Sequence, residues 1–129
     1  MAWRFAEEGL QRNLTACERR ILDALLSNSF PGSNELRQQL VDPGMSVTSL
    51  GEILRFDFHL PNTPRANVEF QVPVEATSHD VDGIQINFAL HVVHGRLSEL
   101  EIYRIDGSPM ECEPGIEKMK EIVSPPYDQ

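Results

Sequence analysis

The sequence predicts an α+β fold in which two N-terminal helices pack on one face of a four- to five-stranded antiparallel meander sheet, followed by a short C-terminal helix. Two observations carry this prediction. Apolar residues recur at helical spacing before residue 41, and apolar and polar residues alternate along several segments between residues 53 and 103. Alternation of this kind is typical of an antiparallel sheet that has one buried face and one solvent-facing face.

The first helix is expected to begin after Thr15, because Thr15 and Glu18 form a capping-box pattern. The apolar stripe of this helix consists of Ile21, Leu22, Leu25 and Leu26. The helix should end near Asn28, before a Pro-Gly pair. A second, short helix is predicted over residues 34–41, with Ser33 as its N-cap.

Strand alternation is clearest over residues 53–60, 68–76 and 84–92, whereas residues 45–50 fit either a strand or an irregular connection. Pro73 has no backbone N–H, so the strand that contains it should lie at a sheet edge or carry a bulge there. After the sheet, residues 116–123 carry apolar side chains at helical spacing, which predicts the short C-terminal helix.

The segment 81–107 is expected to form the central hairpin, with two strands joined at His94-Gly95. The inward-facing residues are Ile84, Ile86, Phe88, Leu90, Val92, Leu100 and Ile102. These inward sets meet only if the connection holds an odd number of residues, because a one-residue slip turns every side chain to the other face. A three-residue loop of Val93, His94 and Gly95, with Gly95 in the left-handed conformation, meets this requirement.

The length of 129 residues and a hydrophobic fraction of 40% predict a single domain over residues 1–129. Residues 1–13 are expected to form a lead-in from which Trp3 and Phe5 dock on the domain, and residues 124–129 are expected to form a mobile tail. Cys17 is expected to be a small core residue, and no disulfide to Cys112 is expected in a chain without a secretory signal.

The net charge of -9 argues against binding to nucleic acid or to anionic membranes, because both repel an acidic protein. No apolar run approaches the roughly 18 residues that a membrane span needs. The N-terminus lacks the apolar core of a secretory signal, so a cytoplasmic location is expected.

The nearest approach to a metal site is the set His79, Asp80 and Asp82. The run from Asp80 to Gly83 lacks the later glutamate of a calcium loop, and aspartate and glycine there suit a turn, so we expect no metal and no cofactor. Catalysis is not favoured either, since the sequence has no nucleophile elbow and no phosphate-binding glycine loop.

Over residues 10–108 the chain resembles a family of small uncharacterised bacterial proteins. The resemblance is carried by Leu14-Thr15, Glu18, Ile21-Leu22, Leu25-Leu26, Phe30-Pro31-Gly32, Leu36, Gln39-Leu40, Asp82-Gly83, Gly95, Leu97, the run from Glu99 to Tyr103, and Asp106-Gly107. It implies a single-domain bacterial protein and assigns no activity and no site residues.

These observations predict a non-catalytic protein-binding module, immunity- or antitoxin-like, that binds a basic protein partner through the solvent face of its sheet. The residues expected to contact the partner are Asp57, Glu69, Glu99, Glu101, Tyr103 and His91. Two alternatives remain open. One is a small-molecule-binding domain or enzyme with a pocket between the helices and the sheet, and the other is a structural homo-oligomer subunit that pairs through an edge strand.

Overall fold

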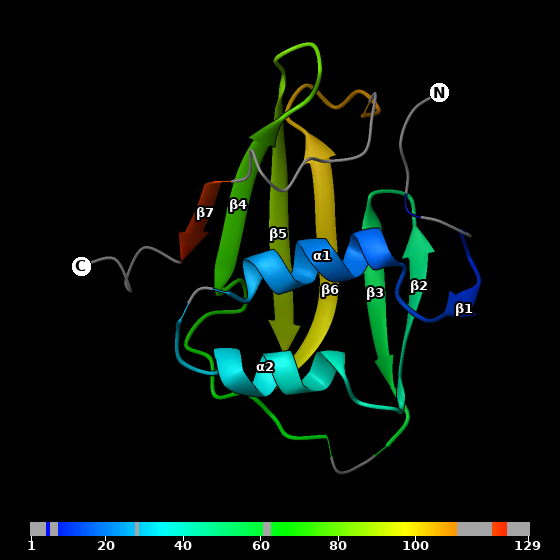
Figure 1. The fold of residues 1–129 in the computed structure, drawn as a ribbon, viewed down its shortest axis with the longest axis vertical. Helices are drawn as coiled ribbons and strands as arrows, with labels where there is room; N and C mark the ends of the chain where they lie inside the picture. The colour runs from blue at the N-terminus through cyan, green and yellow to red at the C-terminus, as the bar shows by residue number, and fades with distance from the viewer. Residues whose placement is uncertain (1–4, 6–7, 28, 61–62, 111–119, 124–129) are drawn as a thin grey trace.

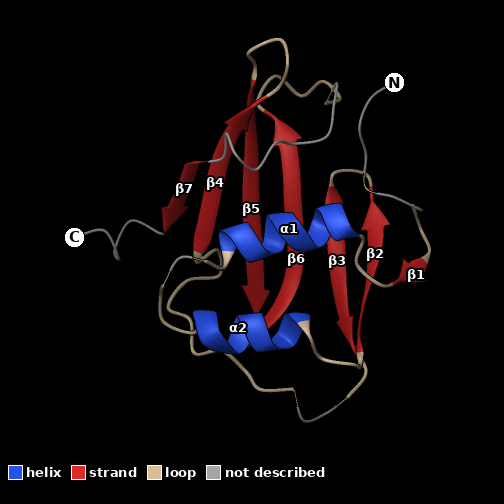
Figure 2. Cartoon of the chain, viewed as in Figure 1, coloured by secondary structure: helices blue, strands red, loops and turns tan. Residues whose placement is uncertain are grey.

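In the part of the chain that the structure describes, two helices lie side by side on one face of an antiparallel sheet, which forms the second layer (Figures 1 and 2). The computed structural model describes residues 5, 8–27, 29–60, 63–110 and 120–123. The helices are α1 (Ala16–Leu25) and α2 (Ser33–Leu40). The strands are β1 (Gln11–Arg12), β2 (Met45–Leu50), β3 (Ile53–Phe58), β4 (Val74–His79), β5 (Gln85–Val93), β6 (Arg96–Arg104) and β7 (Lys120–Val123). The α+β class is therefore confirmed.

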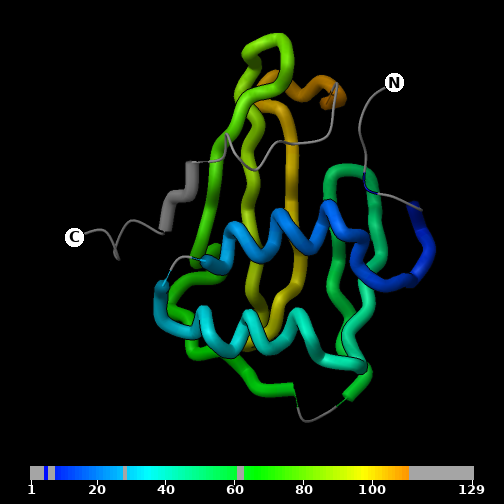
Figure 3. The backbone as a smooth tube through the Cα atoms, viewed as in Figure 1, coloured from blue at the N-terminus to red at the C-terminus, as the bar shows by residue number. Residues whose placement is uncertain are grey.

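Among the described residues the sheet has seven strands, in the order β1-β2-β3-β6-β5-β4-β7, which corrects the expected four to five strands of a simple meander. The hairpin β2-β3 joins the meander β4-β5-β6 through pairing of β3 with β6. The chain from β3 to β4 runs below α2 in the view of Figure 3 and reaches β4, which lies beyond β6 and β5 in the same sheet. Strands β1 and β7 were missed because two and four residues are too few for alternation to be visible.

The expected C-terminal helix is wrong for residues 120–123, which form β7 and pair with β4 from Val74 to Thr77. Residues 116–119 lie outside the described residues. A short segment with apolar residues at positions 122 and 123 fits one turn of helix or a strand equally well. The edge of β4 offers backbone hydrogen-bond partners to residues 120–123, and these bonds favour a strand over a helix.

Helix α1 begins where the capping box places it. The Glu18 amide donates to Thr15 Oγ1 at 3.1 Å, and the Thr15 amide donates to Glu18 Oε1 at 3.0 Å. The Glu18 carboxylate also accepts two hydrogen bonds from Arg12, at 2.8 and 2.7 Å, although its side chain is almost fully buried. This buried pair ties β1 to α1, so part of the expected lead-in of residues 1–13 belongs to the sheet.

Helix α2 begins one residue earlier than expected, and Ser33 is not its N-cap. Gly32 takes that position with a φ of +93°, and it has no side chain to donate or accept a bond. The Ser33 hydroxyl instead accepts from the Phe30 amide at 3.3 Å, in the preceding turn. A side chain at Gly32 would approach Val68 Cγ1 to 2.8 Å, so close contact as well as backbone conformation requires glycine.

The central hairpin has the predicted facing but a different turn. Ile86, Phe88, Leu90, Leu100 and Ile102 are all buried on the helical side. The connection is the two-residue turn His94-Gly95, with φ values of +52° and +76°, rather than a three-residue loop. The register changes between His91, which faces Glu99, and Val92, which faces Leu97. Ser98 is therefore the extra residue of a bulge. With the two turn residues it gives the odd number of unpaired residues that keeps the apolar side chains of both strands on the same face.

The strand expected over residues 68–76 begins only at Val74, directly after Pro73. Residues 68–73 lie outside any strand, although the Val92 amide donates to the Gln71 carbonyl at 2.7 Å. A proline directly before the first strand residue is compatible with the ladder, because its missing donor falls outside the paired segment.

One cluster of buried apolar residues fills the space between the helices and the sheet. Phe5 belongs to this cluster, which confirms that it docks on the domain, and Cys17 is partly buried against it. Trp3 and Cys112 lie outside the described residues, as does the tail from residue 124. No helix in the described segments is long and apolar enough to span a membrane.

Candidate functional site

The face of the sheet opposite the helices carries a group of polar and charged side chains, which we call the open face. Both described helices lie on the other side (Figure 1). The open face consists of Arg55, Asp57, Glu75, Asn87, His91, Glu99, Glu101 and Tyr103. Each of these residues alternates with buried neighbours such as Leu54, Ala76, Phe88 or Leu100.

The strand register places the central members of the open face directly beside one another. Glu99 lies between Arg55 of β3 and His91 of β5 in one row across the sheet. Glu101 lies between Ile53 and Ala89 in the next row. Side chains directly opposite on neighbouring strands are about 4.5–5.5 Å apart at Cβ, so the two glutamates and their neighbours form one continuous surface.

Hydrogen bonds hold part of this surface in place. His91 Nε2 lies 3.4 Å from Glu101 Oε1, and Asn87 Nδ2 donates to the Tyr103 hydroxyl at 3.2 Å. Asn87 in turn accepts from Gln85 Nε2 at 2.8 Å. Within the described part of the chain, no hydrogen bond or ion pair engages the side chain of Glu99. The Tyr103 hydroxyl is thus held by Asn87, whereas the Glu99 carboxylate is available to a partner.

Five of the six predicted contact residues lie on the open face, and Glu69 does not. Glu69 is exposed in the irregular segment before β4, where strand alternation does not apply. Asp57 is on the open face but opposite Ser46 of β2, because the pairing of β3 with β6 covers only residues 53–55. The acidic centre of the face is therefore Glu99 and Glu101.

The predicted weak metal candidates are separated by an arginine that the sequence reading did not identify. Arg104 Nη1 lies 2.9 Å from Asp80 Oδ2 and 2.9 Å from Asp82 Oδ2, and Nη2 lies 2.8 Å from Asp106 Oδ2. His79 is exposed at the end of β4 and pairs with Gln85 instead. The guanidinium occupies the position where these aspartates would hold a cation.

Arg104, Asp80, Asp82 and Asp106 form a group that we call the arginine cluster. The burial of its central pair indicates a role in holding the fold together. The side chain of Arg104 is 5% exposed and that of Asp80 is fully buried. Hydrogen bonds from Arg104, then from the Ser108 hydroxyl and amide, hold the pKa of Asp106 well below its usual range. The same carboxylates, Asp106 first, raise the pKa of Arg104. The sequence did contain a signal for this cluster. Strand alternation places Arg104 on the inward side after Leu100 and Ile102, and a buried charge requires partners.

Metal addition is expected to leave the protein's melting temperature unchanged. Among the residues that the structure describes, no three His, Cys, Asp or Glu side chains are grouped to hold a metal ion. Melting curves should therefore coincide with EDTA and with one equivalent of zinc or calcium, since binding to the native state alone raises the melting temperature. An increase of several degrees with stoichiometric metal would contradict this expectation.

A family model described as a domain of unknown function, DUF6984, matches residues 11–114. This range includes the open face, the arginine cluster and both helices. No curated protein and no solved structure matches the chain.

Proposed function

We propose that this chain, which belongs to the DUF6984 family of domains of unknown function, is a non-catalytic protein-binding module that receives a basic partner on its open face. The specific form of the proposal is an immunity- or antitoxin-like protein of the bacterial cytoplasm. Its partner would be a protein with a positively charged surface.

The observation that carries the proposal is the charge of the open face. Its carboxylates are Asp57, Glu75, Glu99 and Glu101, and Arg55 lies beside Glu99 in the strand register. Carboxylates on neighbouring strands add their potentials at low ionic strength, which favours encounter with a cationic surface. The whole chain carries a net charge of -9, which acts in the same direction.

Tyr103 is the residue best suited to anchor a partner. Its ring lies on the same face as the two central glutamates, and its hydroxyl is already bonded to Asn87. Tyrosine is enriched among the few interface residues that supply most of the binding energy, and a fixed ring loses little conformational freedom on association. The glutamates would mainly govern the association rate, and Tyr103 would govern the lifetime of the complex.

Reversing the two central charges is expected to slow partner association. For a partner captured from the source cell, Glu99→Lys with Glu101→Lys should lower the association rate constant by about tenfold or more and weaken its salt dependence. Surface plasmon resonance at several salt concentrations measures both quantities.

The matched control is Asp23→Lys with Glu35→Lys, which makes the same change in net charge on the helices. Circular dichroism should show an intact fold for both double variants. If the two double variants associate at the same rate, net charge alone steers the partner. An association rate unaltered by the Glu99 and Glu101 changes would remove the open face as the docking surface.

A further inference from the structure

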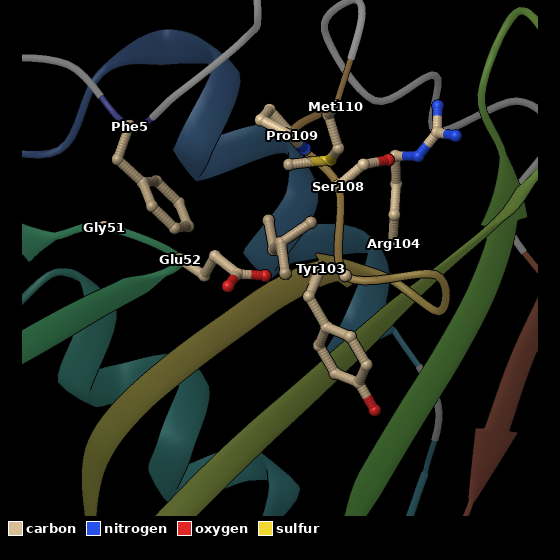
Figure 4. A pocket seen from close by; sticks show the side chains of 10 residues that line it. Phe5, Gly51, Glu52, Tyr103, Arg104, Ser108, Pro109 and Met110 are labelled. Atoms are coloured by element: carbon tan, nitrogen blue, oxygen red, sulfur yellow. The ribbon is translucent and has the colours of Figure 1, made fainter.

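A separate pocket lies at one end of the sheet, between the turn that joins β2 to β3 and the segment that follows β6 (Figure 4). Its volume is about 220 Å³. Buried Phe5, Ile102 and Met110 form its apolar wall, and exposed Glu52 and Ser108 lie at its rim. The pocket therefore combines an apolar interior with a charged opening.

We propose that this pocket binds a small organic ammonium ion, with the apolar body of the ligand on Phe5, Ile102 and Met110 and its charged head on the Glu52 carboxylate. Figure 4 shows the Phe5 ring and the Glu52 side chain on one side of the pocket and Met110 and Ser108 on the other. Aromatic rings and thioether sulfur both suit an alkyl or aryl ligand that carries a cation.

The size of the pocket limits the ligand to a small molecule. Pockets that take drug-sized ligands have volumes of roughly 300–1,000 Å³, and this one lies below that range. A single ring or a short alkyl chain that ends in an ammonium group is the matching class.

The charges around the pocket select a cation over an anion. The Glu52 carboxylate makes no hydrogen bond or ion pair within the described part of the chain. Arg104 also lines the pocket, but its guanidinium nitrogens already bind Asp80, Asp82 and Asp106. That cluster has one positive and three negative groups, so its excess charge is negative as well.

The local backbone fixes the position of Glu52. Gly51, with a φ of +61°, takes the first position of the two-residue turn between Leu50 and Ile53. The Gly51 amide donates to Glu8 Oε1 at 2.9 Å, and the Ile102 amide donates to the Glu52 carbonyl at 3.0 Å. The turn is thus held from both sides, so the backbone that carries the Glu52 side chain is fixed at the rim of the pocket.

This site does not depend on the proposed protein-binding function. The Tyr103 ring points away from the pocket in Figure 4, in agreement with its place on the open face. A ligand in the pocket would contact the helical side of β6 at Ile102 and leave the central glutamates of the open face free.

Isothermal titration calorimetry of the full chain with three probes of similar size tests the proposal. We expect 2-phenylethylamine to bind with a Kd on the order of 1 mM, the neutral 2-phenylethanol to bind about tenfold more weakly, and 3-phenylpropanoate to show no saturable binding. In Glu52→Gln, the affinity for the amine should fall to that for the alcohol. In the control Glu75→Gln, which removes a carboxylate of the open face, the affinity for the amine should be unchanged.

Amide chemical shifts locate the ligand. Titration with the amine should move the resonances of Gly51, Glu52 and Met110 in wild type and in Glu75→Gln. Equal affinity for the amine and the alcohol, wild-type affinity in Glu52→Gln, or shifts confined to other parts of the protein would each overturn the proposal.

Discussion

Replacing Phe88 by alanine is expected to lower the free energy of unfolding by about 3–5 kcal/mol. Phe88 is 1% exposed and lies on β5, the strand between β6 and β4 in the sheet. Its direct neighbours, Ile102 and Ala76, are also buried, so the ring fills the centre of the apolar layer beneath the helices. Truncation removes its apolar contacts and leaves a cavity that a rigid sheet cannot close.

Chemical denaturation of the variant measures this loss. The matched control is Val93→Ala on the same strand, where the side chain is 38% exposed and the expected loss is within about 0.5 kcal/mol. A loss below about 1 kcal/mol for Phe88→Ala would mean that the hairpin register differs from the one described.

The parts of the fold that follow from local physics were predictable from the sequence. The capping box needs only Thr15 and Glu18, three residues apart, and the facing of Phe88 needs only the alternation of its own strand. The bulge at Ser98 could not be predicted, because a two-residue turn plus one extra residue and a three-residue loop give the same facing. The alternation of apolar and polar residues shows which side chains face inward. It does not show whether the extra residue lies in the turn or in a bulge.

Long-range pairing explains the remaining differences in the fold. Nothing in β3 or β6 alone indicates that they are neighbours, because the partner of each strand depends on the path of the chain past α2. The strand β7 forms because β4 has an unpaired edge, a property of the assembled sheet rather than of residues 120–123.

The candidate sites likewise combine features that local sequence predicts with features that only long-range contacts determine. Glu99, Glu101 and Tyr103 were placed correctly because they alternate within one long strand. Glu69 was misplaced because the strand begins later, at Val74. Arg104 and Glu52 were missed for a different reason. Their surroundings combine residues from distant segments, such as Asp80 beside Arg104 and Phe5 beside Glu52, which only the folded chain brings together.

A second large effect is expected at Gln39, a fully buried amide at the end of α2. Its Nε2 donates to the Pro64 carbonyl at 2.7 Å and to the Gly95 carbonyl at 2.9 Å. Its Oε1 accepts from the Leu97 amide at 2.9 Å. One side chain therefore joins α2 to the segment before β4 and to the turn between β5 and β6.

Gln39→Ala is expected to lower the free energy of unfolding by about 3–5 kcal/mol, because each buried backbone group left without a partner costs about 1–3 kcal/mol and the truncation adds a cavity. The Gly95 carbonyl keeps one partner, the Ala66 amide at 2.8 Å, so the Leu97 amide and the Pro64 carbonyl account for most of the loss. Denaturant titration measures it against Gln38→Ala, an exposed neighbour on the same helix, which should change stability by no more than about 0.5 kcal/mol. Equal stability of the two variants would show that water replaces the Gln39 amide, and that the turn at Gly95 is held by the strands alone.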